Sequence, residues 1–272
     1  MQPRNVVALV VSLALLATAC SRLTFIRPDM GGGDYVRTAP TYEFRDDPAT
    51  KQRTALRNHL VLGSDALQTG QVDEAEKEAR AALKIAPGSA DAYTLLAVIE
   101  GQRGNTSQAG GYYAKAAELA PQQGTALNNY GAWLCGNGRA AESLGWLDRA
   151  LADAAYQQRA SALANAGSCA LTAGQTGRVD RDLREALSLD PGDATALGAM
   201  ADYQYRGGHY MDARAFSERR LAAAPATPTV LRLASQIEDK LGDKAAAARY
   251  VQRLRMEFPQ AGTVQLGESS QP

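Results

Sequence analysis

The chain has 272 residues, enough for about two average domains or for one array of repeats. It carries 29 Lys and Arg against 29 Asp and Glu, and the balance argues against a strongly basic nucleic-acid-binding protein and against a solvating acidic tail. Hydrophobic residues make up 45% of the chain and aromatic residues only 6%, with Ala in almost every block of ten. This composition excludes wholesale disorder and favours helices.

Residues 1–19 have the layout of a secretory signal peptide. Arg4 supplies a positive charge at the start, and an almost unbroken apolar run follows over residues 6–17. A helix of about twelve residues reaches roughly 18 Å, against a hydrocarbon core of about 30 Å. We therefore expect a cleavable signal peptide and not a permanent membrane-spanning helix.

The end of this segment resembles the lipobox of bacterial lipoproteins, in the run Leu16-Ala17-Thr18-Ala19-Cys20. The resemblance implies that Cys20 becomes the acylated first residue of the mature chain, where several acyl chains anchor far more firmly than one. Ala17 stands where that motif usually has Leu, unless Leu16 serves by a shift. Ser21 after the cysteine implies the outer membrane of a Gram-negative cell. The alternative is an ordinary signal peptide with a chance cysteine.

Residues 20–50 are expected to be the lipidated N-terminus and a flexible linker. They contain three consecutive glycines and Pro28, Pro40 and Pro48, without a helical period. About thirty such residues have a root-mean-square reach near 30 Å. Residues 260–272 are expected to form a disordered tail.

The remainder repeats with a fixed spacing, marked by prolines that each follow a helix-like segment: Pro87, Pro121, Pro191, Pro225 and Pro259. The intervals are 34, 70, 34 and 34 residues, and the 70 equals two repeats with two extra residues, the missing proline falling near Ala155-Tyr156. A 34-residue period is typical of the tetratricopeptide repeat (TPR), a helix–turn–helix unit.

Positions inside the repeat agree with this interpretation. With each proline as position 32, position 8 is always small: Gly63, Ala97, Gly131, Gly167, Ala201 and Ser235. A turn glycine follows seven residues later: Gly70, Gly104, Gly138, Gly174, Gly208 and Gly242. Position 20, on the packing face of the second helix, is Ala75, Ala109, Ser143, Val179, Ala213 and Ala247. We therefore predict an all-α fold, a TPR superhelix over residues 51–259 whose six helix–turn–helix repeats fill residues 56–259 as a right-handed solenoid.

Cys135 and Cys169 lie in the first helices of the third and fourth repeats, 34 residues apart. First helices of adjacent repeats pack side by side, and a signal peptide implies an oxidising compartment, so we predict a disulfide. The two cysteines occupy positions 12 and 10, which are not equivalent. The alternative is a pair of reduced, buried small hydrophobic residues.

Enzyme chemistry is not expected. His59 and His209 have no neighbouring nucleophile in the sequence, and the three glycines of the linker lack the flanking elements of a phosphate-binding loop. No catalytic, cofactor-binding or metal-binding residue is predicted. We instead expect partners to bind the inner face of the first helices, through these residues: Leu60, Leu67, Val98, Asn128, Asp202, Tyr205, Arg232 and Gln236.

A lipobox, a short linker and six TPRs together resemble the PilW/PilF family of type IV pilus biogenesis lipoproteins. The runs that carry this resemblance are Leu127-Asn128-Asn129-Tyr130-Gly131 with Leu134-Cys135, then Asn165-Ala166-Gly167 with Cys169-Ala170-Leu171, and the closing segment 237–259. The resemblance implies an outer-membrane pilotin, lipid-anchored on the periplasmic side. Such a protein binds the secretin subunit of the pilus machine and promotes its outer-membrane localisation and multimerisation. Separately from the resemblance, we expect a monomer, since an end-capped TPR array can be monomeric.

Two other interpretations stay open at this point. One is a TPR lipoprotein adaptor for another periplasmic machine, such as a protease, a cell-wall enzyme or the outer-membrane protein assembly machinery. The other is an enzyme with an unrecognised site. Binding partners separate the first from a pilotin, and the small stock of histidines and cysteines argues against the second.

Overall fold

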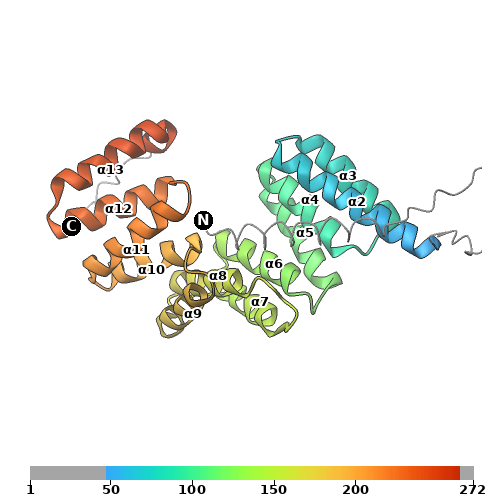
Figure 1. The fold of residues 1–272 in the computed structure, drawn as a ribbon, viewed down its shortest axis with the longest axis horizontal. Coiled ribbons are helices and arrows are strands. Elements are labelled where there is room, and N and C mark those ends of the chain that lie inside the picture. The colour runs from blue at the N-terminus through green and yellow to red at the C-terminus, as the bar shows by residue number, and fades with distance from the viewer. Residues whose placement is uncertain (1–46, 264–272) are drawn as a thin grey trace, which may run out of the picture. The chain divides into compact units, whose positions relative to one another are not determined.

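The computed structural model describes residues 47–263. The predictions for the signal peptide, for Cys20, for the linker up to residue 46 and for the tail from residue 264 lie outside the described residues. Within the described range the chain forms twelve α-helices and no strand, followed by a short 3-10 helix over Pro259–Thr263 (Figure 1). None of these helices is both long and apolar enough to cross a membrane.

The helices form six antiparallel pairs, as the period predicts. The first helices, here called A helices, are α2 (Pro48–Gln68), α4 (Ala90–Gln102), α6 (Gly124–Gly136), α8 (Arg159–Thr172), α10 (Ala194–Arg206) and α12 (Pro228–Leu241). The second helices, here called B helices, are α3 (Val72–Ile85), α5 (Thr106–Leu119), α7 (Ala140–Ala152), α9 (Thr176–Leu189), α11 (Tyr210–Ala223) and α13 (Lys244–Glu257). The predicted all-α TPR solenoid is confirmed.

Two boundaries differ slightly from expectation. Helix α2 begins at Pro48, inside the segment predicted as linker, because the Asp47 side chain caps it by accepting a 2.8 Å hydrogen bond from the Thr50 amide. At the other end, the 3-10 helix Pro259–Thr263 takes up residues 260–263 of the predicted tail.

Each turn between an A helix and its B helix depends on a glycine in the left-handed region. The six predicted turn glycines have φ between 72° and 85°, and they are the residues with positive φ among those described. A side chain at such a φ is strained, so glycine ends the A helix and lets the chain reverse.

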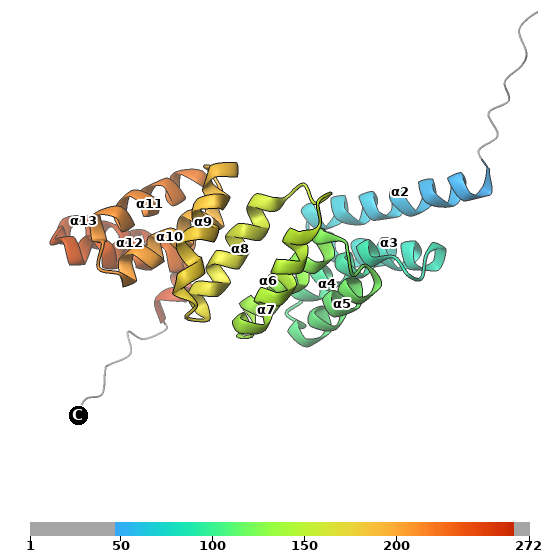
Figure 2. The same cartoon turned by 90° about the horizontal axis from the view of Figure 1, so that it is seen from below.

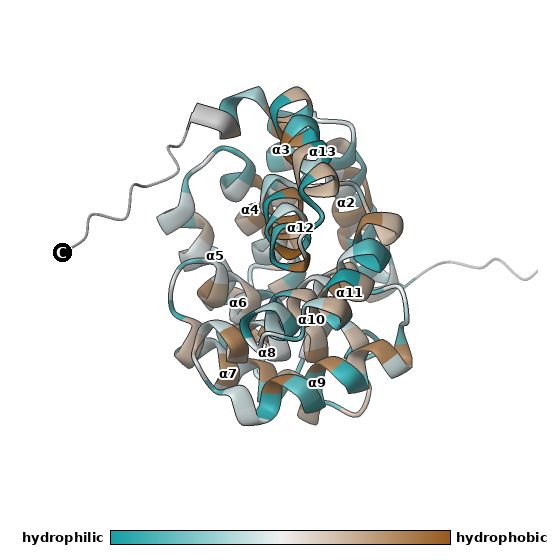
Figure 3. Cartoon of the chain, turned by 90° about the vertical axis from the view of Figure 1, so that its left-hand side faces the viewer, coloured by the Kyte–Doolittle hydropathy of each residue, from teal (hydrophilic) through white to brown (hydrophobic). Residues whose placement is uncertain are grey.

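Close packing within a repeat occurs at the predicted small residues. A Cβ added to Gly131 would lie 2.9 Å from Cγ of Leu147, and one added to Gly167 would lie 2.5 Å from Cδ2 of Leu183. All six residues at position 20 are buried. Along α9, hydrophobic and hydrophilic residues alternate (Figure 3), because only one face of this B helix packs against the core.

Neighbouring A helices contact one another along the whole series from α2 to α12, and each B helix from α3 to α11 also packs against the A helix of the next repeat. Successive B helices make no comparable contact among the described elements. The A helices α4, α6, α8 and α10 therefore form a continuous inner layer, and the B helices form an outer layer. The helix pairs follow one another in chain order along the array (Figure 2). This packing makes the A face the concave one.

The connection between α7 and α8 has no proline at the expected place, and contacts of Tyr156 and Asp153 with the start of α6 hold it in position. Tyr156 is buried, and its ring lies against Gly124 at the start of α6, where an added Cβ would meet Cγ at 2.5 Å. Asp153 accepts 2.9 Å hydrogen bonds from the amides of Gly124 and Ala155, and these two bonds lower the pKa of its carboxyl. Burial raises the pKa of the Tyr156 phenol. The two extra residues are thus absorbed without loss of the repeat packing.

We expect Gly167→Ala to lower the free energy of unfolding by about 1–3 kcal/mol, because its methyl group would overlap Leu183. The matched control is Gly145→Ala, since Gly145 lies in α7 and an added Cβ there meets nothing within 4 Å. The control is expected to be neutral or stabilising by up to about 1 kcal/mol. Urea unfolding followed by circular dichroism measures both, and equal midpoints for the two variants would contradict the close-packing argument.

Candidate protein-binding groove

The inner layer carries two separate hollows. The first, here called the N-terminal hollow, has a volume of about 450 Å³ between α2 and α4. Its lining consists of Leu60, Ser64, Leu67, Gln68, Asp91, Thr94, Leu95, Val98 and Gln102. Leu60, Ser64 and Leu67 share one face of α2, since they are spaced four and three residues apart. The structure thus brings together the predicted residues Leu60, Leu67 and Val98.

The second, here called the C-terminal hollow, has a volume of about 530 Å³ between α8, α10 and α12. Its polar and charged lining residues are Ser168, Thr172, Thr195, Asp202, Arg206, Ser217, Arg220, Thr227, Thr229, Arg232 and Gln236. The predicted residues Asp202, Arg232 and Gln236 meet here. Asp202 accepts hydrogen bonds of 3.0 and 2.6 Å from Arg206 one turn further along α10.

Two predicted groove residues line neither hollow. The side chain of Asn128 is buried, and its Oδ1 accepts a 3.0 Å hydrogen bond from Nδ2 of Asn165 in the next A helix. Tyr205 packs against Tyr210, with ring centroids 5.7 Å apart. The prediction that Asn128 is one of the partner-binding residues of the inner face therefore needs correction, because its side chain is buried and its oxygen is used in a contact between α6 and α8.

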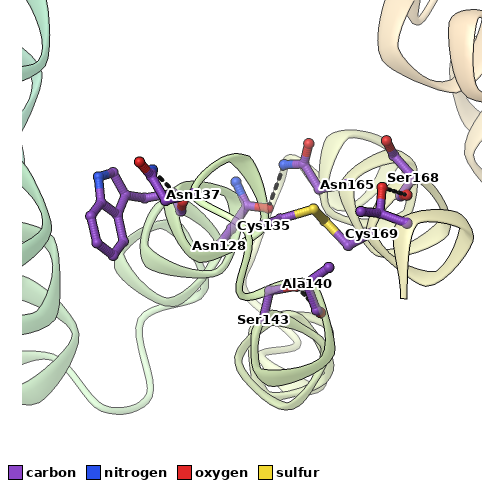
Figure 4. Close-up of a disulfide and its surroundings, with 10 residues drawn as sticks. Asn128, Cys135, Asn137, Ala140, Ser143, Asn165, Ser168 and Cys169 are labelled. Atoms are coloured by element: carbon purple, nitrogen blue, oxygen red, sulfur yellow. Dashed lines mark hydrogen bonds between the residues drawn. A yellow bond between two sulfur atoms is a disulfide. The ribbon is translucent and has the colours of Figure 1, made fainter. Parts of the chain in front are cut away.

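A disulfide joins Cys135 of α6 to Cys169 of α8, with Cα atoms 5.7 Å apart. Figure 4 shows this bond and the Asn128–Asn165 hydrogen bond along the same pair of helices. The bond links position 12 of one A helix to position 10 of the next. A shift of two residues is only about 3 Å along a helix, so both Cα atoms stay within disulfide reach. The third and fourth repeats are thereby joined on the inner layer.

Arg206 and Arg220 belong to the C-terminal hollow but were not predicted. Arg220 comes from the B helix α11, and its side chain passes along Gly198 of α10, whose added Cβ would lie 3.9 Å from Arg220 Cδ. The absence of a side chain at this inner-face position leaves room for the arginine. Gly198, at position 5 of the fifth repeat, is the sequence feature that indicates open space here, but it does not show which side chain fills that space.

The histidines lie outside both hollows. Nδ1 of His59 is 2.5 Å from Oε2 of Glu78, and Nδ1 of His209 is 2.9 Å from Oε1 of Gln204. Residues 47–263 contain no group of three or more His, Cys, Asp and Glu side chains placed to hold a metal ion. The two open hollows of the inner layer differ in chemistry: the N-terminal hollow is mostly apolar, and the C-terminal hollow is lined by polar and charged side chains.

Comparison with known proteins agrees with this architecture. The tetratricopeptide repeat model matches residues 90–123, the second helix pair, and the all-α solenoid of six such pairs is the TPR fold. The chain is 27% identical over 201 residues to the type IV pilus assembly protein PilF of Pseudomonas aeruginosa, covering 74% of this chain and 80% of PilF.

Solved structures point the same way. A structure of Pseudomonas aeruginosa PilF matches with a TM-score of 0.65 and 27% identity, covering 77% of this chain and 95% of PilF. A structure of PilW, a widely conserved type IV pilus biogenesis factor, matches with a TM-score of 0.66 and 26% identity over 75% of this chain and 94% of PilW. A TPR protein from Parabacteroides merdae, 16% identical with a TM-score of 0.59 over 77% of this chain and 86% of its own, shares the fold. The predicted resemblance to the TPR proteins of type IV pilus biogenesis is confirmed.

We expect the mature protein, denatured without reductant, to show no reactive thiol at Cys135 or Cys169, and two after reduction. Reduction is expected to lower the free energy of unfolding by about 4 kcal/mol, because a closed loop of roughly this length restricts the unfolded chain. Thiol labelling and urea unfolding measure the two effects. The control is the double variant Cys135→Ser/Cys169→Ser, whose unfolding should not respond to reductant. Two labelled thiols before reduction would refute the pairing.

Proposed function

We propose that this protein is an outer-membrane lipoprotein that acts as the pilotin of a type IV pilus machine. It binds the secretin subunit and promotes the localisation and multimerisation of the secretin in the outer membrane. The observation that carries the proposal is the match to PilF over 80% of that relative, a protein named for type IV pilus assembly. The TPR scaffold supports a role in binding a protein rather than in catalysis.

The parts of the chain have separate tasks in this proposal. Acyl chains on Cys20 fix the protein to the membrane, and the segment after Cys20 gives the folded repeats reach. The two hollows of the inner layer receive an extended segment of the secretin. Because repeats held by the Cys135–Cys169 bond and by close helix packing are already ordered, binding costs little conformational entropy on this side.

The direct test compares a deletion strain complemented with wild-type protein or with Cys20→Ala. We expect wild type to restore the secretin multimer in outer-membrane fractions and twitching motility, whereas Cys20→Ala folds but leaves the secretin unassembled or in the wrong membrane. Immunoblots of fractionated membranes give the readout. Normal multimers in the deletion strain would reject the pilotin role and favour an adaptor for another periplasmic machine.

The N-terminal hollow gives a second prediction. Val98→Asp places a charge among apolar lining residues and is expected to weaken secretin binding roughly tenfold, since an apolar contact is replaced by an unpaired carboxylate. The matched control is Val61→Asp, because Val61 is 52% exposed on α2 and lines neither hollow. Co-purification of the secretin with each variant, alongside thermal unfolding, makes the comparison. Equal binding by both variants would exclude this hollow from the interface.

A further inference from the structure

The C-terminal hollow has more positive than negative charge. Its lining contains three arginines and one aspartate, which leaves two positive charges in excess. Asp202 and Arg206 neutralise each other through two hydrogen bonds within α10. The excess therefore belongs to Arg220 and Arg232.

Arg220 is held in place by the backbone and not by a carboxylate. Its Nη1 donates hydrogen bonds of 3.1 and 3.2 Å to the carbonyl oxygens of Ala224 and Pro225, at the end of α11. Its aliphatic part runs beside Gly198. No carboxylate of residues 47–263 pairs with it, although its side chain is half-buried. A fixed, half-buried guanidinium keeps donors available for a planar anion.

Arg232 lies in α12 at the same hollow and is exposed. Its side chain forms no hydrogen bond or ion pair with any other residue of the described part of the chain, unlike most arginine side chains of the B helices. The hydroxyl and amide groups of Thr195, Thr229 and Gln236 line the surface beside it. These groups suit the backbone of an extended peptide, which presents both donors and acceptors.

The N-terminal hollow has the opposite character. Its only charged lining residue is Asp91, and Leu60, Leu67, Leu95 and Val98 supply its apolar surface. The N-terminal hollow therefore suits apolar side chains, and the C-terminal hollow, on the same inner face, suits a polar or charged ligand. Because the C-terminal hollow carries an excess of positive charge, charge complementarity favours an acidic ligand there.

We propose that the C-terminal hollow is a binding site for an acidic, extended protein segment, whose carboxylates pair with Arg220 and Arg232. Only the identity of the protein that carries this segment rests on the proposed function. A carboxylate that reached Arg220 would accept hydrogen bonds from the guanidinium N–H groups that do not already donate to the Ala224 and Pro225 carbonyls. Arg232, on α12, would pair with the same acidic segment.

The test uses the full chain in detergent and an array of overlapping 15-residue peptides from the secretin subunit. A matched array replaces every Asp and Glu by Asn and Gln. We expect the bound peptides to be rich in acidic residues, to lose binding on neutralisation, and to bind more weakly as salt concentration rises. Arg232→Glu should weaken their binding roughly tenfold, because it removes one attraction and adds a repulsion.

The control is Arg255→Glu, which makes the same charge change on α13. The side chain of Arg255 is exposed, forms no ion pair or hydrogen bond with another described residue and does not line the hollow. It should leave binding unchanged, and it removes the effect of net charge from the comparison. Because both arginines are exposed, neither variant is expected to change the unfolding midpoint. An equal loss of binding in both variants would overturn the site.

The remaining outcomes separate this inference from the proposed function. If secretin peptides bind but do not depend on their acidic residues or on Arg232, the acidic-segment site is wrong and the pilotin role stands. If no secretin peptide binds while acidic peptides from an unrelated library do so through Arg232, the site stands and the pilotin role fails. Flotation with vesicles of phosphatidylglycerol that depends on Arg232, with no peptide bound, would show a membrane contact and overturn the proposal.

Discussion

The close approach of the two helices within each repeat is the constraint on which the rest of the structure depends. At Gly131 and Gly167 the A helix has no side chain, and a leucine of the B helix occupies the space. No single pair buries enough apolar surface to be stable alone, so each pair relies on the next. The turn glycines, the buried position 20 and the order of the A helices all follow from this geometry.

Two kinds of contact join neighbouring repeats, and they lie in different layers. On the outer side, arginines bridge adjacent units: Arg103 reaches Asp73 and Glu76 of the preceding B helix, and Arg178 reaches Asp148. Arg103 donates hydrogen bonds that, together with those from Arg80, lower the pKa of the Glu76 carboxyl. Exposed pairs of this kind contribute little each. On the inner side, the centre of the array has a covalent bond and a part-buried hydrogen bond between Asn128 and Asn165.

The features that follow a period could be predicted from the sequence. Proline spacing and small residues located all six helix pairs, and repeat positions placed Leu60, Leu67 and Val98 in one hollow. Contacts that depend on which way a side chain of one helix points toward another helix could not be predicted. Nothing in the sequence shows that Arg220 of a B helix passes beside Gly198 into the inner face, or that Asn128 pairs with Asn165. The contacts of Asp153 and Tyr156 with Gly124 could not be predicted either, because two extra residues interrupt the 34-residue period there.

The Cys135–Cys169 bond lies in the inner layer, between the helices that line the N-terminal hollow and those that line the C-terminal hollow. Bending of such an array opens or closes spaces mainly between the outer helices, where successive helices are joined only by side-chain contacts such as the Arg178–Asp148 ion pair. Along the inner layer, the covalent bond keeps α6 and α8 from moving apart. A secretin segment that reached from one hollow to the other, as proposed, would therefore cross a step of fixed length between the third and fourth repeats. The length of chain between its apolar and acidic side chains would then affect binding, as would their chemistry.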